Sequence, residues 1–347
     1  MKQIKCLISF LESSANVFLL LWMTLCVVIY AYLPNMPRVV PQPEIAVDPS
    51  MPYSEDPQQL IDLHNFEYII EQPSCAPHTQ ALIMVHSAPG NAERRSVIRQ
   101  TWGHVATNST SQSPLRLVFL FGTVADDELQ SSLLAEHEQH KDLLQGNFLD
   151  GYYNLTYKHV MALKWFHTHC EQARLLVKVD DDIYLNTPQL QHHLSHPSPP
   201  WNPLSALHSQ RQLLLCAINK RDRVARSYSS KWRVGFQEYP HRYYPPFCPG
   251  FAVFYSSQVV RRLYFAAQAS NFFRLDDVLV TGILSKRCNI TLTDLKSYVL
   301  YPNKLKLLLK GRLEPEQYLV SWHKMSPQQI IGLWQLHGMV STTNTLK

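Results

Sequence analysis

Hydrophobic and polar positions are arranged in blocks along the chain, and each block predicts its own element. Short apolar runs, typical of strands buried on both faces, occupy 81–87, 115–122 and 174–182. Segments with helical character lie beside them, at 91–102, 126–140 and 154–170. This alternation predicts an α/β fold in which helices flank a largely parallel sheet.

The same architecture continues toward the C-terminus. A short extended segment is expected at 146–150, and further strands at 213–219 and 251–257. Helices are expected at 276–286 and 327–337. No repeated unit is visible along the chain, which excludes a solenoid.

The first strongly apolar block is longer than any of these. Residues 17–33 carry no charged side chain, and a membrane-crossing helix needs about 17–25 apolar residues. Lys2 and Lys5 precede the block, which favours a cytosolic N-terminus. A cleaved signal peptide and a buried core helix are the alternatives, but no small-residue cleavage pattern follows. We expect a cytosolic tail at 1–16 and an uncleaved transmembrane signal anchor at 17–33.

Prolines dominate the stretch that follows. They are Pro34, Pro37, Pro41, Pro43, Pro49, Pro52 and Pro57. Proline-rich chains form extended, semi-rigid spacers, so we expect a lumenal stem at 34–75. Hydrophobic periodicity returns near residue 60, and the length that remains suits one large α/β domain, which we expect at 76–340.

Sequons and cysteines agree with a lumenal location. N-glycosylation sequons begin at Asn108, Asn154 and Asn289. Five cysteines follow the apolar block, at Cys75, Cys170, Cys216, Cys248 and Cys288. In an oxidising compartment up to two pairs would form and leave one thiol free, but the sequence does not define the pairing.

Composition excludes several classes of protein. The 347 residues carry a net charge of only +5 without a Lys/Arg run, so nucleic acid is not the expected partner. The 11 glycines form neither a dinucleotide-binding fingerprint nor a P-loop. There is no C-x-x-C pair and no H-E-x-x-H motif, which argues against a zinc site and a metalloprotease.

Three consecutive acids close the predicted strand at 174–182. Open α/β sheets bind ligands at the carboxyl ends of their strands, and clustered carboxylates repel one another unless a cation is present. Oxygen ligands suit Mg²⁺ or Mn²⁺, which would hold a diphosphate. A solvated acidic turn is the alternative, whereas the spacing excludes an EF-hand.

Seven blocks of the chain match the motifs of one family in the family's order. They are RRSVIRQTWG (94–103), LVFLFG (117–122), NFLDGYYNLTYKHVMALKW (147–165), KVDDDIYLN (178–186), KWRVGFQEYPHRYYPPFCPGFAVFYS (231–256), LDDVLVTGI (275–283) and VSWHKMSPQQIIGLW (320–334). On these blocks the chain resembles the β-1,3-galactosyltransferase family, glycosyltransferase family 31. The resemblance implies a Golgi type II membrane enzyme with a GT-A fold, whose Rossmann-like sheet is mostly parallel. Two departures are the missing second glycine after Cys248 and Asp276 where glutamate is typical.

The resemblance implies inverting transfer of a hexose from a UDP-sugar to a glycan hydroxyl, forming a β1,3 bond. Inversion needs a carboxylate that takes the hydroxyl proton and a metal that neutralises the leaving diphosphate. From its place in the family's E-D-V block, Asp277 is expected to be the base, with helix N-terminal charge as the alternative. Asp182 and His323 are expected to ligate Mn²⁺ or Mg²⁺, with an ordinary core or surface histidine as the alternative for His323.

The other candidates are expected to contact the substrates. At the nucleotide sugar we expect Asp180, Asp181, Arg95, Arg99 and Lys158. At the acceptor sugar we expect Trp232, Tyr244 and Asp276, because aromatic rings stack on sugar faces. Core packing for the aromatic residues and solvated positions for the basic ones are the alternatives.

The donor sugar and the acceptor stay open at this point. Galactose is the expected donor sugar, with N-acetylglucosamine and N-acetylgalactosamine as alternatives. The expected partners are a UDP-hexose, a glycan on a glycoprotein or glycolipid, and a second copy of the chain in a homodimer. A catalytically inactive glycan-binding relative is the alternative of a different class, disfavoured because both the acids at 180–182 and Asp277 are present.

Overall fold

The computed structural model describes residues 17–19, 21–28, 56–107, 113–197, 199, 202–209, 212–312 and 318–344. The chain divides into two compact units, Met1–Glu44 and Ile45–Lys347. In the first unit, 17–19 and 21–28 are helical. Among the described residues, no helix combines the length and apolar character that a membrane crossing requires. The predicted tail, residues 20 and 29–33 of the predicted anchor, residues 34–55 of the predicted stem, and Asn108 lie outside the described residues.

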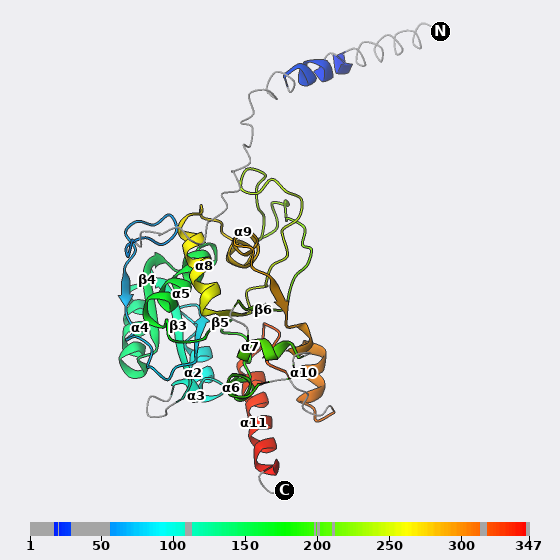
Figure 1. The fold of residues 1–347 in the computed structure, drawn as a ribbon. Helices are drawn as coiled ribbons and strands as arrows, with labels where there is room; N and C mark the ends of the chain where they lie inside the picture. The colour runs from blue at the N-terminus through cyan, green and yellow to red at the C-terminus, as the bar shows by residue number, and fades with distance from the viewer. Residues whose placement is uncertain are drawn as a thin grey trace. The chain divides into compact units, whose positions relative to one another are not determined.

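The second unit is built on an eight-stranded sheet (Figure 1). Its strands are β1 (Tyr68–Ile70), β2 (Ala81–His86), β3 (Leu115–Thr123), β4 (Leu143–Leu149), β5 (Leu175–Asp180), β6 (Leu214–Cys216), β7 (Ala252–Ser256) and β8 (Leu292–Asp294). They lie in the order β1-β4-β3-β2-β5-β7-β6-β8. Strands β2 to β5 run parallel, β6 and β8 share their direction, and β1 and β7 run against them. The predicted α/β fold is therefore confirmed, although the two antiparallel strands were not predicted.

Helices cover both faces of the sheet. One face packs against α5 (Leu155–His169), α8 (Ser257–Gln268) and the π-helical turn η4 (Val278–Leu284). The other packs against α2 (Ala92–Gln100), α4 (Asp127–His140), α6 (Thr187–Ser195), α10 (Pro302–Leu308) and α11 (Pro327–Asn344). Shorter elements are α3 (His104–Thr107), α7 (Ala206–Ser209), α9 (Ser285–Arg287), the parallel pair β9 (Val299–Leu300) and β10 (Val320–Ser321), and the 3₁₀ turns η2 (Tyr152–Asn154), η3 (Pro203–Ser205) and η5 (Lys296–Tyr298).

The two cores follow from strand geometry. Along β2, Leu82 and Met84 join the core beneath α5, whereas Ile83 and Val85 join the core beneath α2. Successive side chains of a strand point to opposite faces, so a strand with helices on both sides must be apolar throughout. All six residues of β2 are buried for this reason.

The folded unit begins before the predicted domain boundary at residue 76. Leu60 and Phe66 are buried in its core, and β1 pairs with β4. Cys75 forms a disulfide with Cys170 at the end of α5. The described part of the predicted stem, 56–75, is thus an integral layer of the domain rather than a spacer.

The second disulfide joins Cys216 at the end of β6 to Cys248 in the loop before β7. Cys288 is buried and free. The prediction of two pairs and one free thiol among the five cysteines is therefore confirmed. A disulfide typically contributes about 2–4 kcal/mol by restricting the unfolded chain, and this one anchors the loop that leads into β7.

Candidate functional site

The strand register brings distant segments to one edge of the sheet. His86 at the end of β2 lies beside Asp180 at the end of β5. Because β7 is antiparallel to β5, its first residue Ala252 pairs with Val179, near the end of β5. The loop that contains Gly250 therefore meets the acids that follow β5. A cleft of about 790 Å³ opens at this edge, and Asp180, Asp182, Asp276, Asp277 and His323 all line it.

Lys178 holds the floor of the cleft together. It lies two residues before Asp180 on the same face of β5, and its Nζ lies 2.7 Å from Asp180 Oδ1. It also donates to the carbonyl oxygen of Gly250. Although burial opposes it, the negative charges of Asp180, Asp276 and Asp277 raise the pKa of Lys178. Burial raises the pKa of Asp180 to about 6, with Lys178 acting against that rise.

Asp276 and Asp277 are neighbours in the chain but have different partners. Asp276 accepts a hydrogen bond from His159 Nδ1 at 2.8 Å, and despite burial this bond lowers its pKa. Asp277 lines the cleft and accepts only from the backbone N–H of Val278, at 2.8 Å, among its described side-chain bonds. Burial, followed by the charge of Asp276, raises the pKa of Asp277 to about 7. One acid is held ionised while the other is suited to exchange a proton near neutral pH.

Asp182 and His323 face the same part of the cleft. Asp182 Oδ1 is buried without a hydrogen-bond partner. Buried polar atoms are normally paired, so this oxygen is free to bind a ligand. Burial lowers the pKa of His323 despite the charge of Asp182, so its ring is neutral and able to bind a metal. Among the described residues no group of three or more His, Cys, Asp or Glu side chains is placed to hold a metal. Within the described part of the chain, Asp182 and His323 are the two candidate ligands at this position, and a metal would need further oxygens from a substrate or water.

Aromatic and basic side chains form the rim of the cleft. Trp232 is 54% exposed, and the ammonium of Lys231 lies 4.6 Å from the centre of its ring and 5.1 Å from that of Tyr152. Tyr244 also lines the cleft but is buried, and its hydroxyl has no hydrogen-bond partner. Both predicted aromatic residues are thus at the cleft, Trp232 as an open surface and Tyr244 within its wall.

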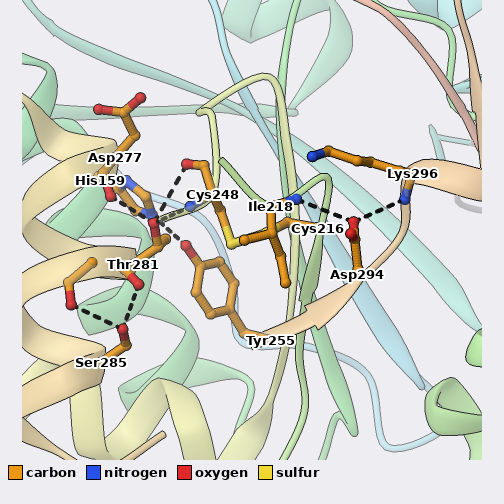
Figure 2. The surroundings of a disulfide bond; sticks show 11 residues. His159, Cys216, Ile218, Cys248, Tyr255, Asp277, Thr281, Ser285, Asp294 and Lys296 are labelled. Atoms are coloured by element: carbon orange, nitrogen blue, oxygen red, sulfur yellow. Dashed lines mark hydrogen bonds between the residues drawn. A yellow bond between two sulfur atoms is a disulfide. The ribbon is translucent and has the colours of Figure 1, made fainter. Parts of the chain in front are cut away.

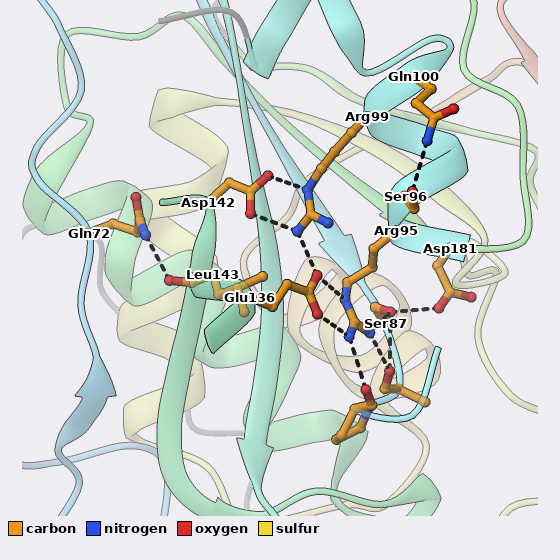
Figure 3. Close-up of polar contacts among 12 residues, drawn as sticks. Gln72, Ser87, Arg95, Ser96, Arg99, Gln100, Glu136, Asp142, Leu143 and Asp181 are labelled. Carbon is orange, nitrogen blue, oxygen red and sulfur yellow. Dashed lines mark hydrogen bonds and ion pairs between the residues drawn. The ribbon is translucent and has the colours of Figure 1, made fainter. Parts of the chain in front are cut away.

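Arg95 and Arg99 are not among the residues that line the cleft. Figure 3 shows both guanidinium groups turned toward Glu136, and Arg99 also toward Asp142. Every N–H group of Arg95 is engaged, with Glu136, Ser87 Oγ and the carbonyl oxygens of Ala88 and Pro89 as acceptors. Arg99 bonds to Glu136 and, through two nitrogens, to Asp142 at 2.7 and 2.8 Å. The structure therefore does not support the predicted binding of a nucleotide by Arg95 and Arg99, because these guanidinium groups connect α2 to α4 and to the loop after β2.

Lys158 and Asp181 are also turned away from the cleft. Lys158 is buried in an ion pair with Asp150 at 2.7 Å, and it donates to the carbonyl oxygen of Ser87. Asp181 accepts from Ser87 Oγ at 2.7 Å and from Asn91 Nδ2 at 2.9 Å. Both side chains therefore stabilise the loop after β2. They would affect nucleotide binding only indirectly, through the conformation of that loop.

Sequence reasoning missed three residues at or behind the cleft. Lys178 was detectable, since a lysine two positions before an acid shares its face of the strand. His159 and Tyr255 carried no such signal, because only the packing of α5 on β7 places them behind Asp276. Asp276, predicted at the acceptor, lines the cleft but bonds to this histidine instead.

Two predicted sequons are described. Asn289 is exposed at a turn with a φ of 50°, a left-handed conformation that asparagine tolerates. Asn154 is half-buried at the start of α5, and its side-chain N–H donates to the carbonyl oxygen of Leu149 at 2.8 Å. Asn289 is therefore the more accessible acceptor for a glycan.

Fold and cleft together define an α/β protein with a carboxylate-lined site at the carboxyl ends of its parallel strands. Residues 93–296 match the sequence model of the family described as Galactosyltransferase. That match spans more than half of the chain, so the protein belongs to this family and is a glycosyltransferase by class.

Characterised relatives agree with this membership. A β-1,3-galactosyltransferase 5 from Pan paniscus is 30% identical over 255 residues, which are 73% of this chain and 79% of the relative. An N-acetyllactosaminide β-1,3-N-acetylglucosaminyltransferase 4 from Mus musculus is 28% identical over 278 residues, 78% of this chain and 74% of the relative. The solved galactosyltransferase LgtC, in complex with donor and acceptor sugar analogues, gives a TM-score of 0.35 at 10% identity. The match covers 71% of this chain and 87% of that one.

Proposed function

We propose that this protein transfers galactose from UDP-galactose to a hydroxyl group of a glycan, with inversion and formation of a β1,3 bond. The observation that carries the proposal is Asp277, a half-buried acid in the cleft whose pKa is raised to about 7. An acid of this kind is more basic than an ordinary carboxylate and is still partly ionised at neutral pH, so it can take a proton from a hydroxyl. The names of the relatives support the linkage and divide between the two donor sugars.

In this proposal the chain's own groups divide the work. Asp277 accepts the proton of the acceptor hydroxyl as that oxygen attacks the anomeric carbon of the donor sugar. Lys178 keeps Asp180 and the loop at Gly250 in place beneath the donor. Trp232 offers the acceptor an exposed aromatic face at the mouth of the cleft. The binding of both substrates side by side lowers the entropic barrier to reaction.

Asp182 and His323 are the residues that would hold Mn²⁺ or Mg²⁺, since the unpartnered Asp182 oxygen and the neutral imidazole fit such an ion. When bound, the ion supplies positive charge that stabilises the departing nucleoside diphosphate. Diphosphate oxygens would complete a coordination shell to which the chain contributes two side chains.

We further propose that the enzyme is a single-pass type II Golgi membrane protein with its catalytic domain in the lumen. The uncharged block at 17–33, the two disulfides and the exposed sequon at Asn289 support this topology. Disulfides form in oxidising compartments, which the secretory pathway provides. We also propose that the protein forms a homodimer. The molecular mass of the detergent-solubilised protein tests this.

Donor turnover by the full-length chain in detergent tests the proposed reaction. UDP-galactose, UDP-N-acetylglucosamine and UDP-N-acetylgalactosamine are each offered with a galactose- or N-acetylglucosamine-terminated acceptor, with Mn²⁺ or with EDTA. We expect UDP-galactose to give the highest kcat/KM and EDTA to abolish transfer. Higher kcat/KM with another donor would overturn the assignment of galactose, and full activity in EDTA would overturn the metal.

Asp277→Asn tests the base directly. The amide keeps the shape of the carboxyl group but cannot accept the proton, so we expect kcat to fall by about 10²–10⁴-fold. The affinity for UDP, measured by calorimetry, should stay near the wild-type value. Retained activity would contradict the role of Asp277 as base, and loss of UDP affinity would assign Asp277 to donor binding instead.

A further inference from the structure

Three buried polar side chains, Tyr255, His159 and Asp276, form a chain behind the proposed base. Figure 2 shows two of them, Tyr255 and His159, together with Asp277. Tyr255 on β7 lies with its hydroxyl 2.9 Å from His159 Nε2, and His159 Nδ1 lies 2.8 Å from Asp276 Oδ2. His159 and Tyr255 are fully buried, and Asp276 is 7% exposed. The proposed transfer reaction does not by itself use His159 or Tyr255.

The partners define the protons along this chain. Burial raises the pKa of the Tyr255 hydroxyl well above its ordinary value, so the hydroxyl stays protonated and donates to Nε2. Burial lowers the pKa of His159, so the ring is neutral with its single proton on Nδ1. That N–H donates to Asp276, since a bare nitrogen lone pair facing a carboxylate would be repelled. As in a catalytic triad, a neutral imidazole donates its Nδ1–H to a buried carboxylate. In the triad the imidazole is itself the base, whereas here it supports the carboxylate that precedes the base in the chain.

The result is a fixed negative charge next to Asp277. Other charged or titratable groups also face this pair: Lys178 and Asp180 from β5, Tyr152 from η2, and His86 from β2 against the His159 ring. Lys178 acts against the charge of Asp276, and Asp180 adds to it. A negative neighbour makes a carboxylate hold its proton more tightly, which strengthens it as a base.

We propose that His159 is a positioning residue: with Tyr255 it holds Asp276 ionised, and the fixed charge of Asp276 makes Asp277 a stronger base. The proposal rests on the proposed function, because it concerns the same base. The role of His159 depends on its Nδ1–H, which donates to Asp276, and the role of Tyr255 depends on its hydroxyl hydrogen, which it donates to His159. Both residues can therefore be tested by substitutions that remove or restore a single hydrogen bond.

The pH dependence of kcat/KM in the full-length chain tests the charge of Asp276. Asp276→Asn keeps an acceptor for His159 but removes the charge. We expect the acidic limb of the profile, which reports ionisation of the base, to move down by about one to two pH units. The plateau rate should fall as well, because a weaker base takes the proton less readily.

A matched pair of substitutions tests His159 itself. His159→Leu removes the N–H, so Asp276 takes up protons more readily and the acidic limb should broaden toward lower pH. His159→Asn places an amide N–H where Nδ1 lies and should restore the limb toward its wild-type position. Tyr255→Phe removes only the hydroxyl, and we expect a smaller shift in the same direction. Thermal unfolding of each variant shows which of them are folded, and Asp276→Asn with Tyr255→Phe decide the matter if His159→Leu is not.

The outcomes separate this inference from the proposed function. If these variants lower the rate equally at every pH and leave the limb in place, the inference is wrong while Asp277 can still be the base. If Asp277→Asn itself keeps activity, the base is another residue and the inference loses its premise, whereas the proposed function fails only if the wild-type chain transfers no sugar. A limb that moves down in Asp276→Asn and returns in His159→Asn supports the positioning role.

Discussion

Two clusters of charged side chains in this domain are built in opposite ways. In the first, Arg95 and Arg99 are buried against Glu136 and Asp142, and both carboxylates meet guanidinium nitrogens at 2.6–2.8 Å. In the second, the acids of the cleft have fewer hydrogen-bond and ion-pair partners than their oxygen atoms could accept. Asp182 Oδ1 is buried without a partner, and Asp277 accepts only from its neighbouring backbone N–H among the described bonds.

The difference shows how charge serves structure in one place and chemistry in another. In the paired cluster, hydrogen bonds from Arg95 and Arg99 overcome burial and lower the pKa of Glu136. In the cleft, burial and repulsion raise the pKa of Asp180 to about 6 and that of Asp277 to about 7. A satisfied carboxylate stabilises the fold, whereas an unsatisfied one is destabilised until a substrate, a proton or a cation arrives. Substitutions in each of the two clusters test this difference.

The largest effect is expected in the paired cluster. Glu136→Ala leaves Arg95 and Arg99 with buried charge that only Asp142 and neutral acceptors oppose. Loss of one partner of a buried ion pair costs about 3–5 kcal/mol. We expect a fall of that size in the free energy of unfolding, measured by urea denaturation monitored by circular dichroism.

Glu138→Ala on the same helix is the matched control. Glu138 pairs with Lys141 at 2.6 Å, but both side chains are largely exposed. Exposed pairs contribute little, so we expect no measurable change in the denaturation midpoint. Equal effects of the two substitutions would show that the buried cluster is no more structural than a surface pair.

Next in size is Asp182→Asn in the cleft. The substitution weakens a ligand of the proposed metal while leaving the fold unchanged, because no described side-chain bond depends on Asp182. We expect the Mn²⁺-dependent affinity for UDP to fall by about 10²-fold or more, which corresponds to about 2.7 kcal/mol. Calorimetric titration of UDP with and without Mn²⁺ gives the measurement.

Asp181→Asn is the control for that prediction. Asp181 belongs to the same run of acids, but its carboxylate accepts hydrogen bonds from Ser87 and Asn91 and does not line the cleft. Its substitution should lower stability and leave the response to Mn²⁺ intact. A lost Mn²⁺ response in Asp181→Asn, with a normal one in Asp182→Asn, would reverse the assignment of the two acids.

The alternation of apolar strands with helices was sufficient to predict the α/β architecture, since burial on both faces leaves a clear pattern in β2, β3 and β5. The antiparallel direction of β7 was not predictable, because strand direction leaves no mark on periodicity. The family resemblance singled out Asp182, Asp277 and His323, and all three line one cleft in the structure. It could not show that Arg95 is fully bonded or that His159 supports Asp276, because both facts depend on contacts between residues far apart in the chain.

The smallest effect concerns stability at the base itself. The folded pKa of Asp277 is about 7, above its ordinary value of 3.8, so folding favours the protonated acid. This contribution is fully present below pH 3.8 and is lost as pH rises through 7. At pH 8 the ionised acid therefore destabilises the apo protein. Asp277→Asn removes that charge and should raise the free energy of unfolding at pH 8 by about 1–3 kcal/mol, allowing for solvent screening.

Thermal unfolding of both proteins in EDTA, without UDP, at pH 5 and pH 8 measures this. Each kcal/mol corresponds to a rise of about 2–4 °C in Tm for a domain of this size, and the gain at pH 5 should be much smaller. Asp180→Asn is the contrast, because it also removes the ion-pair partner of buried Lys178. The cost of leaving that ammonium unpaired should offset any gain from removing the charge of Asp180. If Asp277→Asn instead lowered Tm at pH 8, Asp277 would belong with Asp142 among the paired, structural acids. A gain at pH 8 would mean that the fold tolerates an unfavourable charge at the position where the proposed chemistry needs a base.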